Sequence, residues 1–183
     1  MNNKNMLVAG ALILLGCNSL VGAAERSQNA MDDLSGQLIK AASCGDEGIV
    51  RKLIAAKANM NAADKKGNTS LHYAAENGHL DVVRELVAAK ANMEVANLEG
   101  ETSLLWATWS NSADIVRELL AAKANLSTKN KDGKTVLDLA KEQNKRGIVR
   151  LLRERELEPA VEYIVGGSLA LEPLCNIFKG YLL

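Results

Sequence analysis

The chain has 183 residues, which is enough for one domain with a tail. Hydrophobic residues make up 48% of it, but only 2 Trp, 3 Tyr and 1 Phe are aromatic, so its mostly aliphatic content favours short, closely packed helices over a sheet core. With 22 basic and 22 acidic residues the charge is balanced, and we therefore expect neither nucleic acid nor an anionic membrane surface as an electrostatic partner.

The first 24 residues have the organisation of an export signal. Lys4 lies in a polar start, and the apolar and Gly run from Met6 to Leu15 after it is too short to span a bilayer. We predict that residues 1–24 direct export, that residues 25–30 form a linker, and that the protein is periplasmic, secreted or membrane-anchored.

Two processing sites fit this segment. Leu14-Leu15-Gly16-Cys17 resembles a bacterial lipobox, in which Cys17 is lipidated and becomes the mature N-terminus. Gly22-Ala23-Ala24 fits an A-x-A-like cleavage site, which releases a soluble protein beginning at Glu25. Both interpretations stay open, and an uncleaved N-terminal anchor is a third.

Two further cysteines, Cys44 and Cys175, are too few for a disulfide framework. A single bridge between them and two unpaired thiols are both compatible with the sequence.

The central part of the chain repeats itself. Gly67, Gly100 and Gly133 recur at a spacing of 33 residues. Five further sets of residues recur at the same spacing of 33: Asp64, Asn97 and Asn130; Thr69, Thr102 and Thr135; Leu71, Leu104 and Leu137; Ala74, Ala107 and Ala140; Val82, Ile115 and Ile148. So many matches at one period indicate stacked structural repeats.

Each unit predicts two short helices. Thr69 is a good N-cap for a helix over Ser70 to Asn77, and Gly78 can take the left-handed conformation that ends it. Asp81, or Asp114 in the next unit, is expected to open a second helix with an apolar stripe. Because one unit cannot bury that stripe alone, consecutive units must stack.

The stretch from Asp64 to His79 reads Asp-x-x-Gly-x-Thr-x-Leu-His-x-Ala-Ala-x-x-Gly-His, and this pattern resembles the ankyrin repeat. The resemblance implies an all-α solenoid of stacked helix-turn-helix units with β-turn fingers. It also implies that His72 links turn and helix through hydrogen bonds. We assign four units, residues 31–63, 64–96, 97–129 and 130–153, of which the first and last are caps.

Three lysines depart from the family pattern. Lys57, Lys90 and Lys123 stand where Gly usually follows the second helix. If these residues adopt positive φ, each costs on the order of 1 kcal/mol relative to Gly.

The resemblance further implies a binding scaffold without catalysis, whose contact surface is the concave side. The predicted partner-binding residues on the first helices are Tyr73, Glu76, Asn77, Trp106, Trp109, Ser110, Leu139, Glu142 and Gln143. Those at the finger tips are Lys65, Lys66, Asn68, Leu98, Glu99, Glu101, Lys131, Asp132 and Lys134.

Both tryptophans, Trp106 and Trp109, lie three positions apart and hence on the same side of one short helix. The aligned residues in the other units are smaller or polar, so the solenoid does not require bulk at either position. Exposed Trp is typical of binding hot spots. The alternative is that one Trp folds over its neighbour and fills a groove between units.

Other chemistry is not expected. His72, Glu76 and His79 have a spacing that suggests a metal site, but Gly78 breaks the helix before His79 and no second cluster adds ligands. Gly133-Lys134-Thr135 matches only the end of a phosphate-binding loop. No motif pairs a nucleophile with a base, so we predict neither an enzyme, nor a metal, nor a cofactor.

Residues 154–183 are predicted to be a capping or flexible tail. Residues 153–156 resemble a charged helix end, and Pro159 is expected to interrupt the segment after them. The segment 160–183 is apolar but too broken for a transmembrane helix. It either covers the fourth unit or meets a partner or membrane through its apolar terminus.

These observations favour an exported monomer that binds an unidentified partner protein. Membrane contact is expected only through an N-terminal lipid or the apolar tail. The alternatives are an envelope-anchored structural or protective accessory lipoprotein and a secreted effector that acts on host proteins.

Overall fold

The structure is a computed structural model that describes the backbone of residues 34–165 and the side chains of residues 34–157. The predicted export segment 1–24, the linker 25–30, Cys17, Cys175 and the apolar residues after 165 lie outside the described residues.

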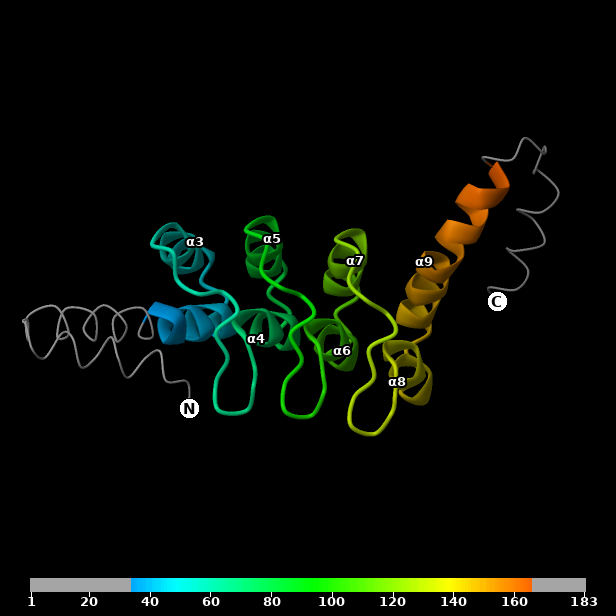
Figure 1. The fold of residues 1–183 in the computed structure, drawn as a ribbon, viewed down its shortest axis with the longest axis horizontal. Helices are drawn as coiled ribbons and strands as arrows, with labels where there is room; N and C mark the ends of the chain where they lie inside the picture. Colours follow the sequence, from blue (N-terminus) through cyan, green and yellow to red (C-terminus); the bar gives the residue numbers. More distant parts are fainter. Residues whose placement is uncertain (1–33, 166–183) are drawn as a thin grey trace, which may run out of the picture.

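Four helix pairs follow one another along the described chain (Figure 1). The first pair is a helix over residues 34–44 and α3 (Glu47–Ala55). The others are α4 (Ser70–Glu76) with α5 (Leu80–Ala88), α6 (Ser103–Trp109) with α7 (Ala113–Ala121), and α8 (Val136–Glu142) with α9 (Arg146–Val165). Residues 34–165 contain no strand, only an isolated bridge between Ala63 and Thr69. The predicted all-α solenoid is confirmed.

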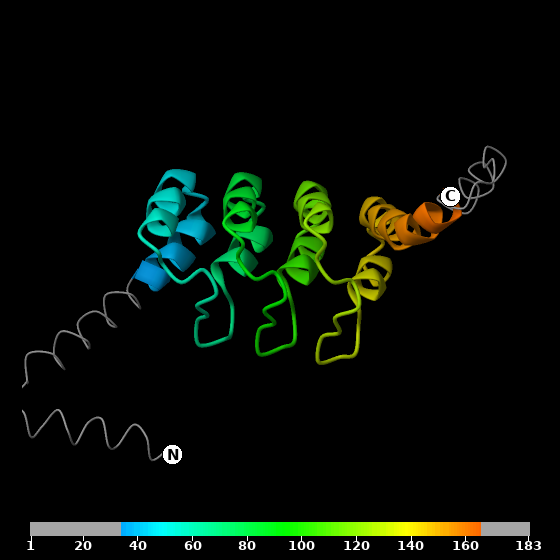
Figure 2. The same cartoon turned by 45° about the horizontal axis from the view of Figure 1, so that its top comes forward.

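The helices form two layers, inner and outer. The inner helices are helix 34–44, α4, α6 and α8, and the outer helices are α3, α5, α7 and α9 (Figure 1). Three fingers, residues 63–69, 96–102 and 129–135, project side by side from the inner layer (Figure 2). The Leu98 N–H donates to the Lys66 carbonyl at 2.9 Å, and the Lys131 N–H donates to the Glu99 carbonyl at 2.9 Å. Each finger is therefore tied to the next through the backbone.

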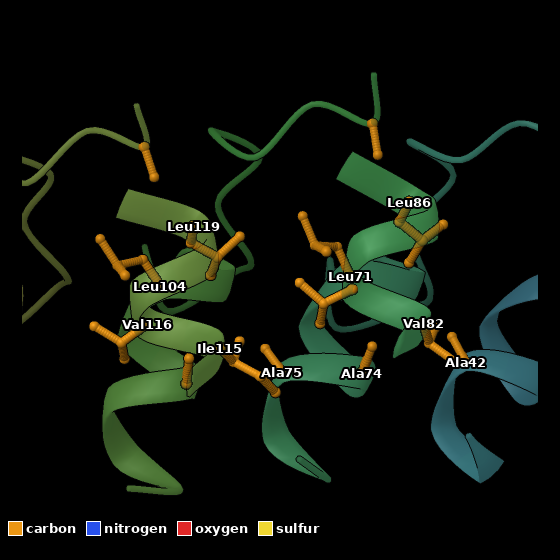
Figure 3. Packing of buried hydrophobic residues seen from close by; sticks show 14 of the residues in the cluster. Ala42, Leu71, Ala74, Ala75, Val82, Leu86, Leu104, Ile115, Val116 and Leu119 are labelled. Carbon is orange, nitrogen blue, oxygen red and sulfur yellow. The ribbon is translucent and has the colours of Figure 1, made fainter. Parts of the chain in front are cut away.

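The core lies between the two layers (Figure 3). Val82, Val83 and Leu86 of α5 are at most 1% exposed, as are Leu71 and Ala74 of α4. Full burial of an aliphatic side chain of this size stabilises the fold by about 1.5–3 kcal/mol. The small alanine lets the inner helices approach closely, which explains why it recurs at the repeat period.

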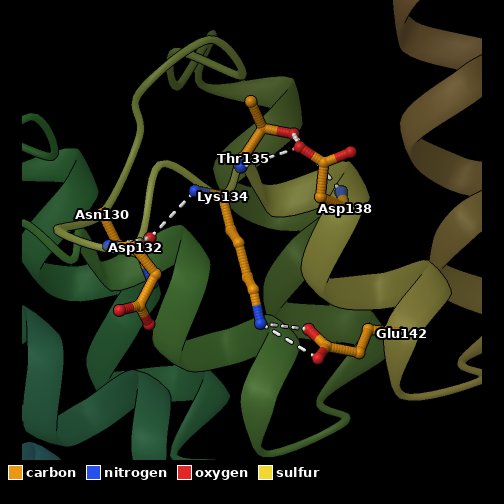
Figure 4. A network of polar contacts seen from close by, with 6 residues as sticks. All are labelled: Asn130, Asp132, Lys134, Thr135, Asp138 and Glu142. Atoms are coloured by element: carbon orange, nitrogen blue, oxygen red, sulfur yellow. Dashed lines mark hydrogen bonds and ion pairs between the residues drawn. The ribbon is translucent and has the colours of Figure 1, made fainter.

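Threonine begins each inner helix after a finger, as predicted. Thr69, Thr102 and Thr135 have extended backbones directly before α4, α6 and α8. Thr135 Oγ1 accepts from the Asp138 N–H at 3.3 Å, and the Asp138 carboxylate accepts from the Thr135 N–H at 3.0 Å (Figure 4). This reciprocal pair satisfies two backbone donors that the helix leaves free.

Several residues end helices in the left-handed conformation. Gly78 has φ +78°, as expected for the residue that ends the first helix. The equivalent residues Asn111 and Asn144 have φ values of 59° and 55°, which asparagine tolerates better than most residues. The lysines after the outer helices, Lys57, Lys90 and Lys123, have φ values of 62°, 64° and 67°. All three lysines therefore adopt the positive φ that was expected to strain their backbone.

Two boundary predictions are wrong. The outer helices do not open at Asp81 and Asp114 but one residue earlier, so the aspartates lie in the first turn, where a negative charge favours the helix dipole. Helix α9 does not end at residues 153–156 but continues through Pro159 to Val165. A proline removes one backbone hydrogen bond and costs about 3 kcal/mol, which opposes a helix without forbidding it.

None of the described helices is both long enough and apolar enough to cross a membrane.

Candidate partner-binding surface

The predicted site residues of the inner helices form two rows, because equivalent positions recur in each repeat. Helices α4, α6 and α8 pack against one another in order, so each row crosses three repeats. The first row contains Tyr73, Trp106 and Leu139, and the second contains Glu76, Trp109 and Glu142. Together with the fingers, these rows make up a surface that we call the inner surface.

Trp106 is half-buried between two repeats. Its ring packs edge-to-face on His72 and Tyr73 of the preceding repeat, at centroid distances of 5.7 and 6.0 Å. Its Nε1–H donates to Glu101 Oε2 at 2.8 Å. Trp106 therefore fills a groove between units, as the structural alternative predicted, and it presents only part of its ring to a partner.

Trp109 has a different environment, although it is only one helical turn away. Its side chain is 68% exposed. Its backbone carbonyl accepts a hydrogen bond from Lys145 Nζ, which also binds the Thr108 carbonyl at 2.7 Å. Desolvation lowers the pKa of Lys145. The fourth repeat thus covers the end of α6 while the Trp109 ring points away from the core.

Leu98 is the second exposed apolar residue of this repeat. It lies at a finger tip and is 61% exposed. The third large apolar residue that is exposed in the described region, Ile49, lies on the outer helix α3 and is 45% exposed. The inner surface of the third repeat therefore carries the two most exposed large hydrophobic side chains of residues 34–157.

The Tyr73 hydroxyl group forms its hydrogen bonds within the protein. Its hydroxyl donates to Asp64 Oδ2 at 2.6 Å, and this bond to a carboxylate raises the pKa of Tyr73. Burial alone would raise the pKa of Asp64, but hydrogen bonds from Tyr73 and from the N–H groups of Asn68 and Lys66 outweigh it and hold that pKa below its usual value. The bond fixes the finger at residues 63–69 to α4.

Asn68 is not at the surface, which corrects its placement among the exposed finger-tip residues. Its side chain is 3% exposed, since Oδ1 accepts from Asn97 Nδ2 at 3.1 Å and Nδ2 donates to the Tyr73 hydroxyl at 3.4 Å. Asn68 therefore joins two fingers internally. Lys65, Lys66 and Glu99 are exposed as expected.

Glu101 is half-buried, because it accepts from Trp106 and from Asn97 Nδ2 at 3.3 Å. At the finger tips, Glu99 forms an exposed ion pair with Lys131 at 3.5 Å. Such exposed pairs contribute about 0–1 kcal/mol, so this pair adds little to stability.

Two of the remaining predicted inner-helix residues form hydrogen bonds to the neighbouring repeat. Asn77 Nδ2 donates to the Ser43 carbonyl at 3.2 Å, and the Ser110 hydroxyl donates to the Ala75 carbonyl at 3.0 Å, so both link neighbouring repeats. Leu139 packs partly against the core. Gln143 is half-buried, and Glu76 and Glu142 are exposed.

His72 bridges two repeats, as the resemblance implied. Its Nδ1 accepts from the Thr69 N–H at 3.1 Å, so Nε2 carries the proton and donates to the Glu101 carbonyl at 3.0 Å. Burial lowers the pKa of His72 and thus favours the neutral ring. His79 Nε2 lies 3.1 Å from the Ser43 carbonyl. Within the described residues, no three His, Cys, Asp or Glu side chains are grouped to hold a metal ion.

A family model described as ankyrin repeats (3 copies) matches residues 38–130 and 91–163. The chain is an ankyrin-repeat protein. A search of curated proteins gives no match. Ankyrin repeats typically mediate protein–protein binding and are typically non-catalytic.

Sequence reasoning missed Lys145, which covers the end of α6 in this ankyrin-repeat protein. The signal was present in the repeat alignment, because Lys145 occupies the position of His79 two repeats earlier. Both side chains bind a carbonyl at the end of the preceding inner helix, so the position serves contact between repeats.

Proposed function

We propose that this ankyrin-repeat protein is a non-catalytic scaffold that binds a partner protein through its inner surface. The exposure of Trp109, at 68%, supports the proposal most directly. Equivalent positions in the neighbouring repeats hold Glu76 and Glu142, so the ankyrin fold does not need an indole there. An exposed Trp that packing does not require is typical of a binding hot spot.

Covering the Trp109 side chain would contribute substantially to the free energy of binding. A Trp side chain can bury about 150–250 Å². At about 25 cal/mol per Å² of apolar surface, covering the exposed part of Trp109 stabilises a complex by about 2–4 kcal/mol. Leu98, on the same surface, adds a second apolar contact.

The test compares the wild-type chain with Trp109→Ala in capture of proteins from an extract of the producing cells. Ile49→Ala is the matched control, since Ile49 is exposed and apolar but lies on an outer helix. We expect Trp109→Ala to reduce capture of a specific protein at least tenfold, with an unchanged melting temperature. Equal capture by wild type and Trp109→Ala, or equal loss with Ile49→Ala, would contradict the use of the inner surface.

The proposal includes export, which the apolar run from Met6 to Leu15 supports. The lipobox-like Leu14–Cys17 supports a second candidate, an envelope-anchored accessory lipoprotein. Mass spectrometry of the mature protein separates the two, because a diacylated N-terminal Cys17 supports the lipoprotein and a free Glu25 supports a soluble form. An intact Met1 in the mature protein would contradict cleavage at either site.

A further inference from the structure

Trp109 stands between two carboxylates on the neighbouring repeats. Glu76 ends α4, Trp109 ends α6 and Glu142 ends α8, so the three residues hold the same position in consecutive repeats. Their helices lie side by side (Figure 1), and packed helices are separated by about 8–10 Å. These three residues, which we call the acid–Trp row, therefore extend over roughly 20 Å of the inner surface.

All three members of the acid–Trp row are exposed, so none of them is held by the core. Among the described residues, Glu76 forms no ion pair. Glu142 binds Lys134 Nζ through both oxygens, at 2.9 and 2.7 Å (Figure 4). The Lys134 and Glu142 side chains are 39% and 55% exposed, so the pair is largely screened by solvent, contributes little to stability and can be exchanged.

The chemistry of the row matches a cation carried on an aliphatic stem. The face of an indole attracts an ammonium or guanidinium group within about 6 Å of its centre. The stem of Lys or Arg packs on apolar surface while its head stays near solvent and near a carboxylate. Finger-tip charges are mixed, because Lys65 and Lys66 are followed by Glu99 in the next finger. The fingers therefore do not by themselves select one sign of charge in a partner.

We propose that the acid–Trp row binds an Arg- or Lys-bearing segment of the partner protein, with one cation over Trp109 and further cations at Glu76 and Glu142. The inference rests on the proposed function, since it names the chemistry of the partner at the same surface. The Lys134–Glu142 pair is its intramolecular counterpart, in which a finger already places an ammonium group on the row.

The experiment selects binders to the full-length chain from a random 12-residue peptide library, and then measures the dissociation constant of an enriched, fluorescein-labelled peptide by anisotropy. We expect enrichment of Arg or Lys beside apolar residues. Glu76→Gln with Glu142→Gln should raise the dissociation constant about tenfold. Trp109→Leu, which keeps an apolar side chain but removes the π face, should raise it about three- to tenfold. Glu156→Gln on α9, a control that removes one exposed carboxylate away from the row, should leave it unchanged.

The outcomes separate this inference from the proposed function. Acidic or neutral peptides whose binding requires Trp109 would overturn the charge preference and leave the binding surface intact. Basic peptides that bind the double Gln variant as well as wild type would also overturn it. If no peptide depends on Trp109, both proposals fail. Analytical ultracentrifugation tests a second copy as the occupant, and a dimer that Trp109→Ala dissociates would overturn the peptide assignment.

Discussion

The three left-handed lysines make a quantitative prediction about stability. Lys57, Lys90 and Lys123 each follow an outer helix with φ between 62° and 67°. In this conformation the Cβ of an L-residue lies too close to the following carbonyl oxygen, which costs about 1–2 kcal/mol. Glycine has no Cβ and avoids the contact. Replacing any of these lysines by glycine should therefore stabilise the protein.

The net gain is smaller than the strain, because glycine also gains conformational freedom in the unfolded chain. That freedom costs about 0.4–1 kcal/mol, which leaves a gain of about 1 kcal/mol at each site. For a domain of this size such a gain raises the melting temperature by about 3–5 °C. The three sites lie in different repeats, so the triple variant should gain about 3 kcal/mol.

Circular dichroism during thermal and urea unfolding measures these changes. Lys90→Ala is the matched control, because alanine loses the charge and the long side chain but keeps the Cβ. It should change the free energy of unfolding by less than about 0.5 kcal/mol. A Lys90→Gly variant that is no more stable than wild type, or a Lys90→Ala variant that gains as much, would refute strain as the cause.

Three further outcomes test the packing around the site. Trp106→Ala should lower the free energy of unfolding by about 2–3 kcal/mol through lost contacts with His72, whereas Trp109→Ala should leave it nearly unchanged; equal losses in urea melts would contradict their different environments. The Thr108 hydroxyl is buried without a hydrogen-bond partner, so Thr108→Val, which keeps the side-chain volume but removes the hydroxyl, should raise the free energy of unfolding by about 1 kcal/mol. A lower urea midpoint would refute this. Because burial lowers the pKa of His72, the unfolded chain binds more protons below about pH 6.5. Urea midpoints should therefore fall as pH drops through that value. The variant His72→Gln, whose amide can still accept from the Thr69 N–H, should remove most of this pH dependence. An unaltered pH profile in the variant would contradict His72 as its source.

Much of the fold could be predicted from the sequence, because the sequence features that start and end each helix act locally. The Thr at each helix start and Gly78 at a helix end act within one turn of the chain, and the structure confirms them. Repetition strengthens the signal, since the same local pattern recurs at every unit. The extent of α9 was missed for the converse reason, because Pro159 is a strong local signal that the rest of the helix overrides.

The candidate site could be predicted only in part, because the exposure of each side chain depends on its contacts with neighbouring repeats. Asn68 looks like any polar finger residue, yet a hydrogen bond from Asn97 of the next finger buries it. Trp106 and Trp109 lie on the same side of one helix, so the sequence alone does not distinguish their environments. Only the positions of His72 and Glu101 place the first in a groove and leave the second in solvent.

The sequence by itself thus determined the repeat, its helices and the family, because these follow from chemistry within a single unit. The tertiary structure alone decided which side chains a partner can reach. Reach depends on contacts between units, and a residue's own neighbours in the chain do not encode them.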